Sequence, residues 1–252
     1  MCGALGASAF FLSFQNNSAG NQESLPAPRP YESPPMMVTQ TSPATQIEVA
    51  TSSLTITATQ PTAAVNEINL AIPFTSQAPK QNWDAIHEQL CEEAAVLMAA
   101  SYVLGRDIPD ADYADEQLFA IKAFEEERFG YFEDTTAEET AAILREYYKI
   151  SRVTVVYDPT IADITQALLQ GKAVIAPAAG RELGNPYFTA PGPLYHMLVI
   201  KGYTKDGRFI TNDPGTRRGA NYLYDQNIVL NAIHDWNGGD VKNGKKVVIV
   251  VG

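Results

Sequence analysis

Three residues that can form a nucleophilic catalytic set occur in the order Cys91, His196 and Asp213. A cysteine attacks as its thiolate, an imidazolium stabilises that thiolate, and an acidic acceptor fixes the tautomer of the imidazole. Each residue by itself is more often structural: a helical cysteine is usually a small core residue, and Asp-Pro-Gly is first a turn. Their order, with each in a suitable predicted element, indicates thiol chemistry.

The cysteine is predicted to begin a buried helix. The segment 94–100 is apolar on all sides, which is typical of a helix inside a protein, and Gly105 is a plausible C-cap. Unpaired N–H groups and the helix dipole favour a thiolate at such a position. Glu92 and Glu93 follow directly, and their negative charges would oppose a neighbouring thiolate.

The histidine and the aspartate are predicted to lie on one hairpin. Segments 195–203 and 208–212 have the pattern of strands, and Asp206-Gly207 between them is a strong turn signal. The outer ends of two antiparallel strands lie side by side. His196 and Asp213 are therefore expected to be neighbours.

The remaining elements predict an α+β fold, because helices come first and strands dominate later. We expect a helical half, with the cysteine on a central helix, packed on an antiparallel sheet half. The further helices are expected at 112–129, 136–148, 160–170 and 224–236, and the further strands at 68–74, 152–157, 173–176 and 246–251.

Three regions are expected along the chain. Residues 1–14 are apolar and resemble a partial signal or anchor. Residues 15–66 are rich in Pro, Ser and Thr and are expected to be a disordered tether. Residues 67–252 have the alternating apolar and polar patterns of helices and strands and are expected to form a folded domain. This organisation predicts an extracytoplasmic protein, secreted or anchored to a membrane through its N-terminal segment.

Charge and cysteine usage exclude several classes of function. The formal net charge of -11 argues against binding to nucleic acid and against electrostatic binding to anionic lipid. The two cysteines, Cys2 and Cys91, form no disulfide framework, and neither CxxC nor HExxH occurs. We expect no metal and no cofactor, and a monomer that acts on a peptide or protein.

The motifs IPFTSQ, CEEAA, GPLYHMLVIKGY and FITNDPG resemble the papain-like cysteine peptidases of the bacteriocin-processing, double-glycine-leader type. The similarity is greater to their stand-alone relatives in exported bacterial proteins, and it covers about residues 68–252. It implies a papain-like fold with Cys91, His196 and Asp213 as catalytic residues. It also implies that the amide of Gln77 and the N–H of Cys91 form the oxyanion hole.

The chain departs from that family in three ways. The spacing from Gln77 to Cys91 is longer than usual, so the insert between them must loop out. Glu92 and Glu93 stand where the family commonly has Gly after the cysteine. No transporter domain is attached, so the leader-peptide role of transporter-fused members does not carry over.

Other residues compete for these roles. Gln89 is the alternative oxyanion donor, but it lies only two residues before the cysteine, which disfavours it on geometric grounds. His87 is the alternative base, although no orienting acid is evident for it, and it is expected to be a surface or loop residue. His234 is expected to be peripheral.

The substrate groove is expected to involve Trp83 in the insert, Tyr187 in the loop before the strand of His196, and Tyr195 next to His196. The favoured function is a cysteine peptidase that acts through a thioester acyl-enzyme. The same residues could support amide transfer, as in transglutaminase-like enzymes, because both reactions pass through a thioester. A binding module of the same fold with little turnover is the third possibility.

Overall fold

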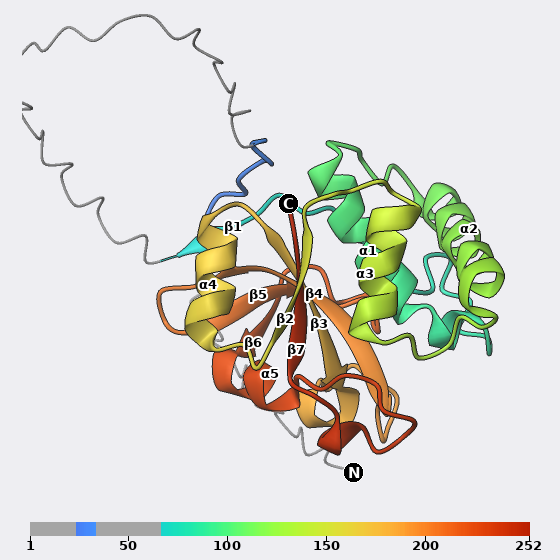
Figure 1. The fold of residues 1–252 in the computed structure, drawn as a ribbon. Helices are drawn as coiled ribbons and strands as arrows, with labels where there is room; N and C mark the ends of the chain where they lie inside the picture. Colours follow the sequence, from blue (N-terminus) through green and yellow to red (C-terminus); the bar gives the residue numbers. More distant parts are fainter. Residues whose placement is uncertain (1–23, 34–66) are drawn as a thin grey trace, which may run out of the picture.

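The computed structural model describes residues 24–33 and 67–252, and it has an α+β fold in which helices flank one antiparallel sheet (Figure 1). The helices are α1 (Cys91–Val103), α2 (Ala111–Phe129), α3 (Ala137–Glu146), α4 (Ile161–Leu169) and α5 (Gln226–Ala232). The strands are β1 (Ile68–Asn69), β2 (Val153–Tyr157), β3 (Ala173–Ala179), β4 (Tyr195–Tyr203), β5 (Arg208–Asn212), β6 (Tyr222–Asp225) and β7 (Val247–Val251). Short 3-10 helices are η1 (His87–Gln89), η2 (Gly180–Leu183) and η3 (Val241–Asn243).

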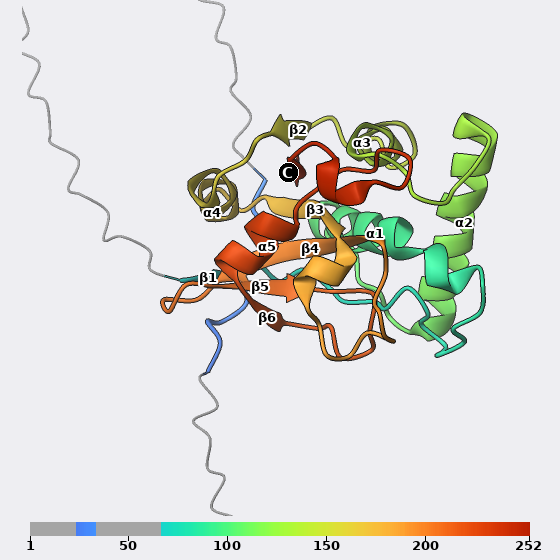
Figure 2. The ribbon, with the colours of Figure 1, turned by 90° about the horizontal axis from the view of Figure 1, so that it is seen from below.

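The sheet has the strand order β2-β7-β3-β4-β5-β6, and β1 adds to β4 outside this path. Every residue of the central strands β3 and β4 is buried. In Figures 1 and 2, α1, α2 and α3 gather at one side of the sheet, while α4 and α5 lie at the other. The predicted division into a helical half and a sheet half is confirmed.

Helix α1 lies at the centre of the core because its middle, residues 94–100, is apolar on all sides. All of its residues except Val103 are buried, and it packs against β3 and β4. Its alanines let the backbone approach the sheet closely, and Leu97 and Met98 fill the space beside them. Full burial of each of these two side chains contributes about 1.5–3 kcal/mol. The predicted start of this helix at Cys91 is confirmed.

Side-chain caps determine where the outer helices begin. Thr136 and Glu139 form the predicted capping box at the start of α3, and Thr160 and Asp163 form a second one at α4. Helix α2 ends at Gly130, whose φ of 89° is a left-handed conformation that favours glycine.

The strand expected to stop at Pro177 continues to Ala179. Pro177 pairs with Met197 of β4, and its carbonyl accepts a hydrogen bond from His234 N at 3.1 Å. The N and C=O of one residue point to the same side of a strand, so the missing N–H of the proline lies on the side away from β4. Strand β7 pairs with β3 only over Ala173–Ile175, so the proline breaks no bond of either ladder.

Two other predicted elements were wrong in extent. The strand expected at 68–74 is only β1, because the chain after Leu70 leaves the sheet. The helix expected at 224–236 is β6 followed by the shorter α5. Strand β6 pairs with the open edge of β5, and Asp225 then caps the helix by accepting from Asn227 N at 2.8 Å.

Residues 24–33 differ from the expected free tether. Arg29 pairs with the backbone of the β1 region, with its N–H 2.7 Å from Asn69 O. The Tyr31 ring packs edge-on against Tyr102 of α1, and its hydroxyl accepts from Arg152 at 2.6 Å. The apolar segment 1–14 and the rest of the expected tether lie outside the described residues. Within residues 24–33 and 67–252, no helix has the length and apolar character needed to span a membrane.

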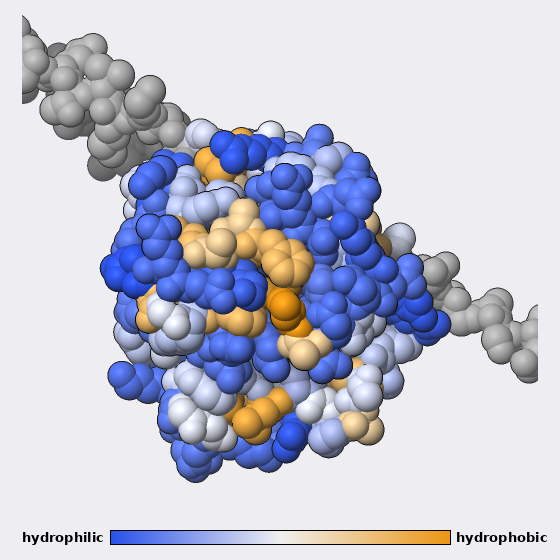
Figure 3. Space-filling model, turned by 90° about the vertical axis from the view of Figure 1, so that its right-hand side faces the viewer, coloured by the Kyte–Doolittle hydropathy of each residue, from blue (hydrophilic) through white to orange (hydrophobic). Residues whose placement is uncertain are grey.

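The outer face of the helical side is mostly hydrophilic, with hydrophobic residues gathered mainly across its middle (Figure 3). Helix α2 lies on this face and exposes acidic residues between its buried positions Ala114, Leu118 and Ile121. The acidic net charge is therefore carried in part by a solvated helix surface.

Candidate active site

Cys91 and His196 line one pocket of about 650 Å³ at the end of the central helix. The walls come from the insert before α1, the loop before β4 and the Gly215–Arg217 turn. The packing of α1 against β4 brings these segments together, although they are far apart in the sequence.

His196 and Asp213 form a buried hydrogen-bonded pair. The distance from His196 Nε2 to Asp213 Oδ1 is 2.8 Å, and both side chains are almost inaccessible to solvent. The expectation that these residues are neighbours agrees with this geometry. Because an ionised carboxylate only accepts hydrogen bonds, Nε2 must donate, which leaves Nδ1 as the ring nitrogen that can exchange a proton.

The carboxylate of Asp213 is held by three further donors. Its Oδ2 accepts from Tyr224 Oη at 2.6 Å and from Asn185 Nδ2 at 3.0 Å, and its Oδ1 accepts from Gly215 N at 3.0 Å. Burial by itself would raise the pKa of Asp213. The charge of His196 and the hydrogen bonds from His196, Tyr224 and Asn185 outweigh burial, so the pKa of Asp213 lies below its usual value.

The imidazole of His196 is also confined from its sides. The Phe188 ring meets it edge-on with centroids 5.3 Å apart. A Cβ at Gly215 would lie 2.8 Å from His196 Cε1, so only glycine leaves room for the ring there. The orientation of the ring is therefore determined by packing as well as by Asp213.

The thiol of Cys91 is buried and hydrogen-bonded to its own helix. Its Sγ–H donates to Glu92 Oε2 at 3.0 Å, and the backbone N–H of Met197, next to His196, also lies by the sulfur. Burial raises the pKa of the Cys91 thiol well above its usual value, and a negative charge on Glu92 would raise it further. The helix start favours a thiolate, but the loss of hydration at this depth opposes it.

Gln77 lies in the same pocket as Cys91 and is buried. Its Nε2 donates to His87 O at 2.9 Å, and its backbone N donates to Pro214 O at 3.0 Å. A side-chain amide has two N–H donors, so one remains for a substrate oxygen. The competing residue, Gln89, also lines the pocket but is exposed on η1.

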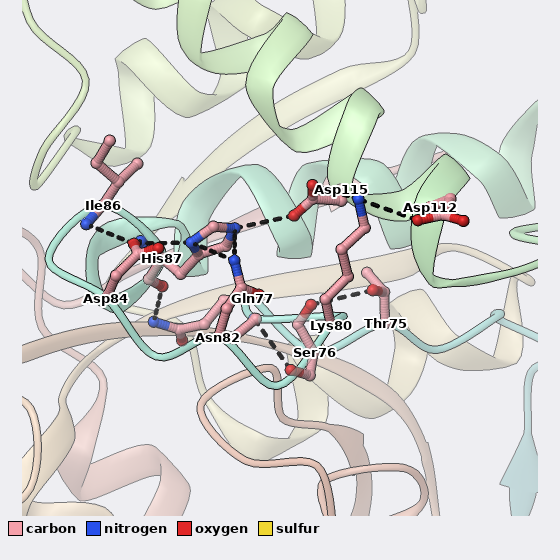
Figure 4. A network of polar contacts seen from close by, with 11 residues as sticks. Thr75, Ser76, Gln77, Lys80, Asn82, Asp84, Ile86, His87, Asp112 and Asp115 are labelled. Carbon is pink, nitrogen blue, oxygen red and sulfur yellow. Dashed lines mark hydrogen bonds and ion pairs between the residues drawn. The ribbon is translucent and has the colours of Figure 1, made fainter.

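His87 has two carboxylate partners, so the expectation of a loop histidine without an acid was wrong (Figure 4). Its Nδ1 lies 2.8 Å from Asp84 Oδ1, and its Nε2 lies 2.9 Å from Asp115 Oδ1. Burial would lower the pKa of His87, but hydrogen bonds and charges from Asp115 and Asp84 outweigh it and raise this pKa. Lys80 joins the network by pairing with Asp115 and Asp112 at 3.0 Å each.

This network joins the insert before α1 to helix α2, as Figure 4 shows. Because Gln77 donates to the backbone carbonyl of His87, the same network also holds the side chain expected to bind an oxyanion. The acid three residues before His87 was visible in the sequence. Asp115 was not, since it lies 28 residues away and only tertiary packing brings it to the ring.

The three residues expected to bind substrate all line the pocket. Trp83 and Tyr187 expose 39% and 46% of their surfaces, so both can contact a ligand. Tyr195 is buried: its hydroxyl donates to Thr135 O at 3.0 Å and its ring packs on Trp236. His234 lies away from the pocket, with its Nδ1 2.9 Å from Gly244 O.

Sequence reasoning missed Asn185 and Tyr224, which both donate to Asp213. Asn185 lies in the long loop before β4, and Tyr224 lies on a strand that was predicted as helix. No local pattern distinguishes either residue. In residues 24–33 and 67–252, no group of three or more His, Cys, Asp or Glu side chains is arranged to hold a metal ion.

The α+β fold, with a cysteine at the start of the central helix and a His–Asp pair on the sheet, is that of the papain-like cysteine peptidases. The sequence model of the Peptidase C39 like family matches residues 69–238, and the chain belongs to this family.

Among solved structures, a candidate C39-like peptidase from Bacillus anthracis is 13% identical, with a TM-score of 0.47, over 74% of this chain and 97% of that one. The cysteine protease interpain A from Prevotella intermedia is 15% identical, with a TM-score of 0.33, over 56% of this chain and 55% of that one. The comparison with curated proteins found no match.

Proposed function

We propose that this protein is a cysteine peptidase that cleaves peptide bonds through Cys91, His196 and Asp213. The observation that carries the proposal is the buried bond between His196 Nε2 and Asp213 Oδ1. It leaves Nδ1 available in the pocket that also contains the cysteine. Membership of a peptidase family supports the same reaction class.

In the proposed reaction, the proton of the Cys91 thiol passes to His196 Nδ1 and the thiolate attacks the carbonyl carbon of the substrate. The free N–H of Gln77 and the backbone N–H of Cys91 stabilise the oxyanion. His196 then protonates the leaving amine as the tetrahedral intermediate collapses to a thioester. Water, deprotonated by His196, hydrolyses the thioester, and the thiol is restored.

The pocket supports a peptide or protein as the substrate. The lining includes the exposed aromatic rings of Trp83 and Tyr187, which can pack against side chains, and the amide groups of Gln77 and Gln89, which can pair with a peptide backbone. Glu88 and Asp134 line the same pocket as Arg217, so it presents both signs of charge.

One observation favours a second candidate, a binding module with little turnover. The Cys91 thiol donates to Glu92, and its pKa is raised by burial, so the resting cysteine is held as a neutral thiol. In this alternative the pocket binds a peptide without attacking it.

Peptide-library cleavage and labelling by an electrophilic peptide probe distinguish the two candidates. The full chain should cleave peptides and be labelled by the probe, and Cys91→Ala should do neither. Cys2→Ser should behave as the wild type, because it lacks only the thiol that the proposed mechanism does not use. Cleavage that survives in Cys91→Ala would exclude the proposed mechanism. Binding of library peptides without cleavage or labelling would favour the binding module, and an amide product formed with added amines would indicate amide transfer.

A further inference from the structure

The two acidic residues that follow the catalytic cysteine are fully buried. Glu92 and Glu93 lie in the first turn of α1, where the side chains of most helices reach water, yet they expose only 1% and 0% of their surfaces. Ionised carboxylates are rarely buried without a cationic partner, because the loss of hydration costs too much. Their burial therefore requires a physical explanation.

Glu92 contacts the reacting atom directly. Its Oε2 lies 3.0 Å from Cys91 Sγ and accepts a hydrogen bond from the thiol, while its Oε1 is buried and has no hydrogen-bond partner among the described residues. A buried carboxylate with one empty oxygen is costly, and a protonated carboxyl is much less so. The hydrogen bond from the thiol by itself favours the carboxylate, but burial with Oε1 unpaired outweighs it and favours the neutral acid.

Glu93 faces a second buried carboxyl, Glu125 of α2. Within the part of the chain that the structure describes, no side chain donates a hydrogen bond to the oxygens of either residue, but the two carboxyls interact with each other. Two carboxyl groups can form a hydrogen bond only if one of them carries a proton. Lys122, the cation beside this pair, also pairs with Glu126 at 2.6 Å, so it is shared between carboxylates.

The titratable groups that interact with Glu92 and its neighbours come from α1, α2, β4 and the loop after α2, and most of them are acidic or neutral. Burial raises the pKa of Glu92 well above its usual value, and the charges of Glu93 and Asp134 act in the same direction. The pKa of Glu125 is raised to about 8, first by burial. The surrounding groups are Cys91 and Glu93 on α1, Lys122 and Glu125 on α2, Asp134 in the next loop and Tyr195 on β4.

We propose that Glu92 is a further catalytic residue, whose neutral carboxylic acid donates a hydrogen bond to the Cys91 thiolate and so stabilises the nucleophile. The inference rests on the proposed peptidase function. In this step the thiol proton moves to His196 Nδ1, and Glu92 keeps its own proton and turns its O–H toward the sulfur. No charge is placed on Glu92 at any stage.

The neutral acid favours the thiolate over the thiol for a simple reason. While the sulfur is a donor, the O–H of Glu92 has no acceptor, because Oε1 is buried without a partner. When the sulfur becomes a thiolate, it is an acceptor 3.0 Å from the carboxyl group, and the O–H gains its bond. A hydrogen bond that forms only with the charged state lowers the pKa of that group. The acidic turn that replaces the usual glycine thus supports the nucleophile.

The test measures the apparent pKa of Cys91 from the ultraviolet absorbance of its thiolate as the pH is varied. All variants are made in the full chain carrying Cys2→Ser, and the spectrum of Cys91→Ala is subtracted at each pH. Glu92→Gln retains a neutral donor at the same position, whereas Glu92→Met has a similar length but no donor. We expect Glu92→Gln to leave the apparent pKa of Cys91 near its wild-type value. We expect Glu92→Met to raise this pKa by about 1–2 units, because a hydrogen bond to a charge is lost. Glu93→Gln is the matched control and should shift it by less than about half a unit.

Several outcomes would overturn the inference. If Glu92→Gln lowers the thiolate pKa by about one unit or more, Glu92 is ionised in the wild type and opposes the nucleophile. If Glu92→Gln and Glu92→Met both titrate like the wild type, Glu92 has no role. Circular dichroism checks folding, and Glu92→Ala replaces Glu92→Met if the latter does not fold.

His196→Ala separates this inference from the proposed function. A raised thiolate pKa in His196→Ala supports the proposed Cys–His pair whatever Glu92 does, so failure of the Glu92 variants alone rejects only the inference. The peptidase mechanism is rejected, and the inference with it, if the apparent pKa of Cys91 is the same in His196→Ala as in the wild type and lies above that of an ordinary thiol in both.

Discussion

The His87 network predicts a pH-dependent contribution to stability that can be isolated by one substitution. His87 is buried, and both ring nitrogens face carboxylates, so the imidazolium form is favoured. Glutamine at this position can still donate a hydrogen bond but carries no charge. His87→Gln therefore removes the charge while retaining much of the polar contact.

The magnitude follows from the exposure of the two partners. The Asp84 side chain is 56% exposed, so water screens this pair and it adds little. The Asp115 side chain is only 16% exposed, and a hydrogen bond between charged groups there contributes about 1.5–3 kcal/mol. Since Lys80 also pairs with Asp115 and persists in the variant, we expect a loss of about 1–3 kcal/mol.

The sign of the pH dependence is determined by the raised pKa of His87. A group whose pKa is higher in the folded state stabilises that state fully below its unfolded pKa, which is about 6.5 for histidine. This contribution is lost as the pH rises through the folded-state pKa. The free energies of unfolding of the wild type and His87→Gln should therefore differ most at about pH 6 and become similar at alkaline pH.

Urea unfolding of both proteins at about pH 6 and about pH 10 measures the two differences in the free energy of unfolding. His234→Gln is the matched control, because the His234 ring lies against the backbone carbonyl of Gly244 and not against a carboxylate of the described residues, so the difference should be small at both pH values. An equal effect of His87→Gln at both pH values would refute the argument, since the charge of His87 would then not be the stabilising feature.

Three further substitutions test the site and the core. Asp213→Asn keeps the shape of the side chain but removes the charge that orients His196, so kcat for peptide cleavage should fall by about 10²–10⁴. Gly215→Ala places a Cβ 2.8 Å from His196 Cε1, so kcat should fall by about 10² or more while the Tm, measured by circular dichroism, changes little. Leu97→Ala in the buried face of α1 should lower the free energy of unfolding by about 2–5 kcal/mol in urea, whereas Leu194→Ala at an exposed position should change it by less than about 0.5 kcal/mol.

Local patterns predicted most of the elements because local physics determines them. The apolar run of α1, the capping box Thr136–Glu139 and the Asp206-Gly207 turn each depend on neighbours in the sequence, and each lies where it was expected. The errors occurred where a distant strand decided the outcome. Strand β6 exists because β5 offers an open edge, and β3 continues through Pro177 because its other side has no strand there.

The charge states of the site residues, unlike the secondary structure, could not be predicted from local patterns. In the sequence, Glu92 and Glu93 were two anions in a first helical turn, and the position of Cys91 favoured a thiolate. Packing under α2 and against β4 buries all three residues, and burial raises the pKa of each one. The repulsion between neighbouring charges could be expected because these residues are adjacent in the sequence. The loss of hydration could not, because it depends on which elements cover the site.

By itself, the sequence determined the fold class, the start of the central helix and the hairpin that carries His196 and Asp213, because helix patterns, caps and turns act over short distances. Only the tertiary structure decided what surrounds those groups: Asn185 and Tyr224 on the Asp213 carboxylate, Asp115 on His87, and Glu125 facing Glu93. These partners come from remote segments, and their hydrogen bonds and exclusion of water set the protonation of each group.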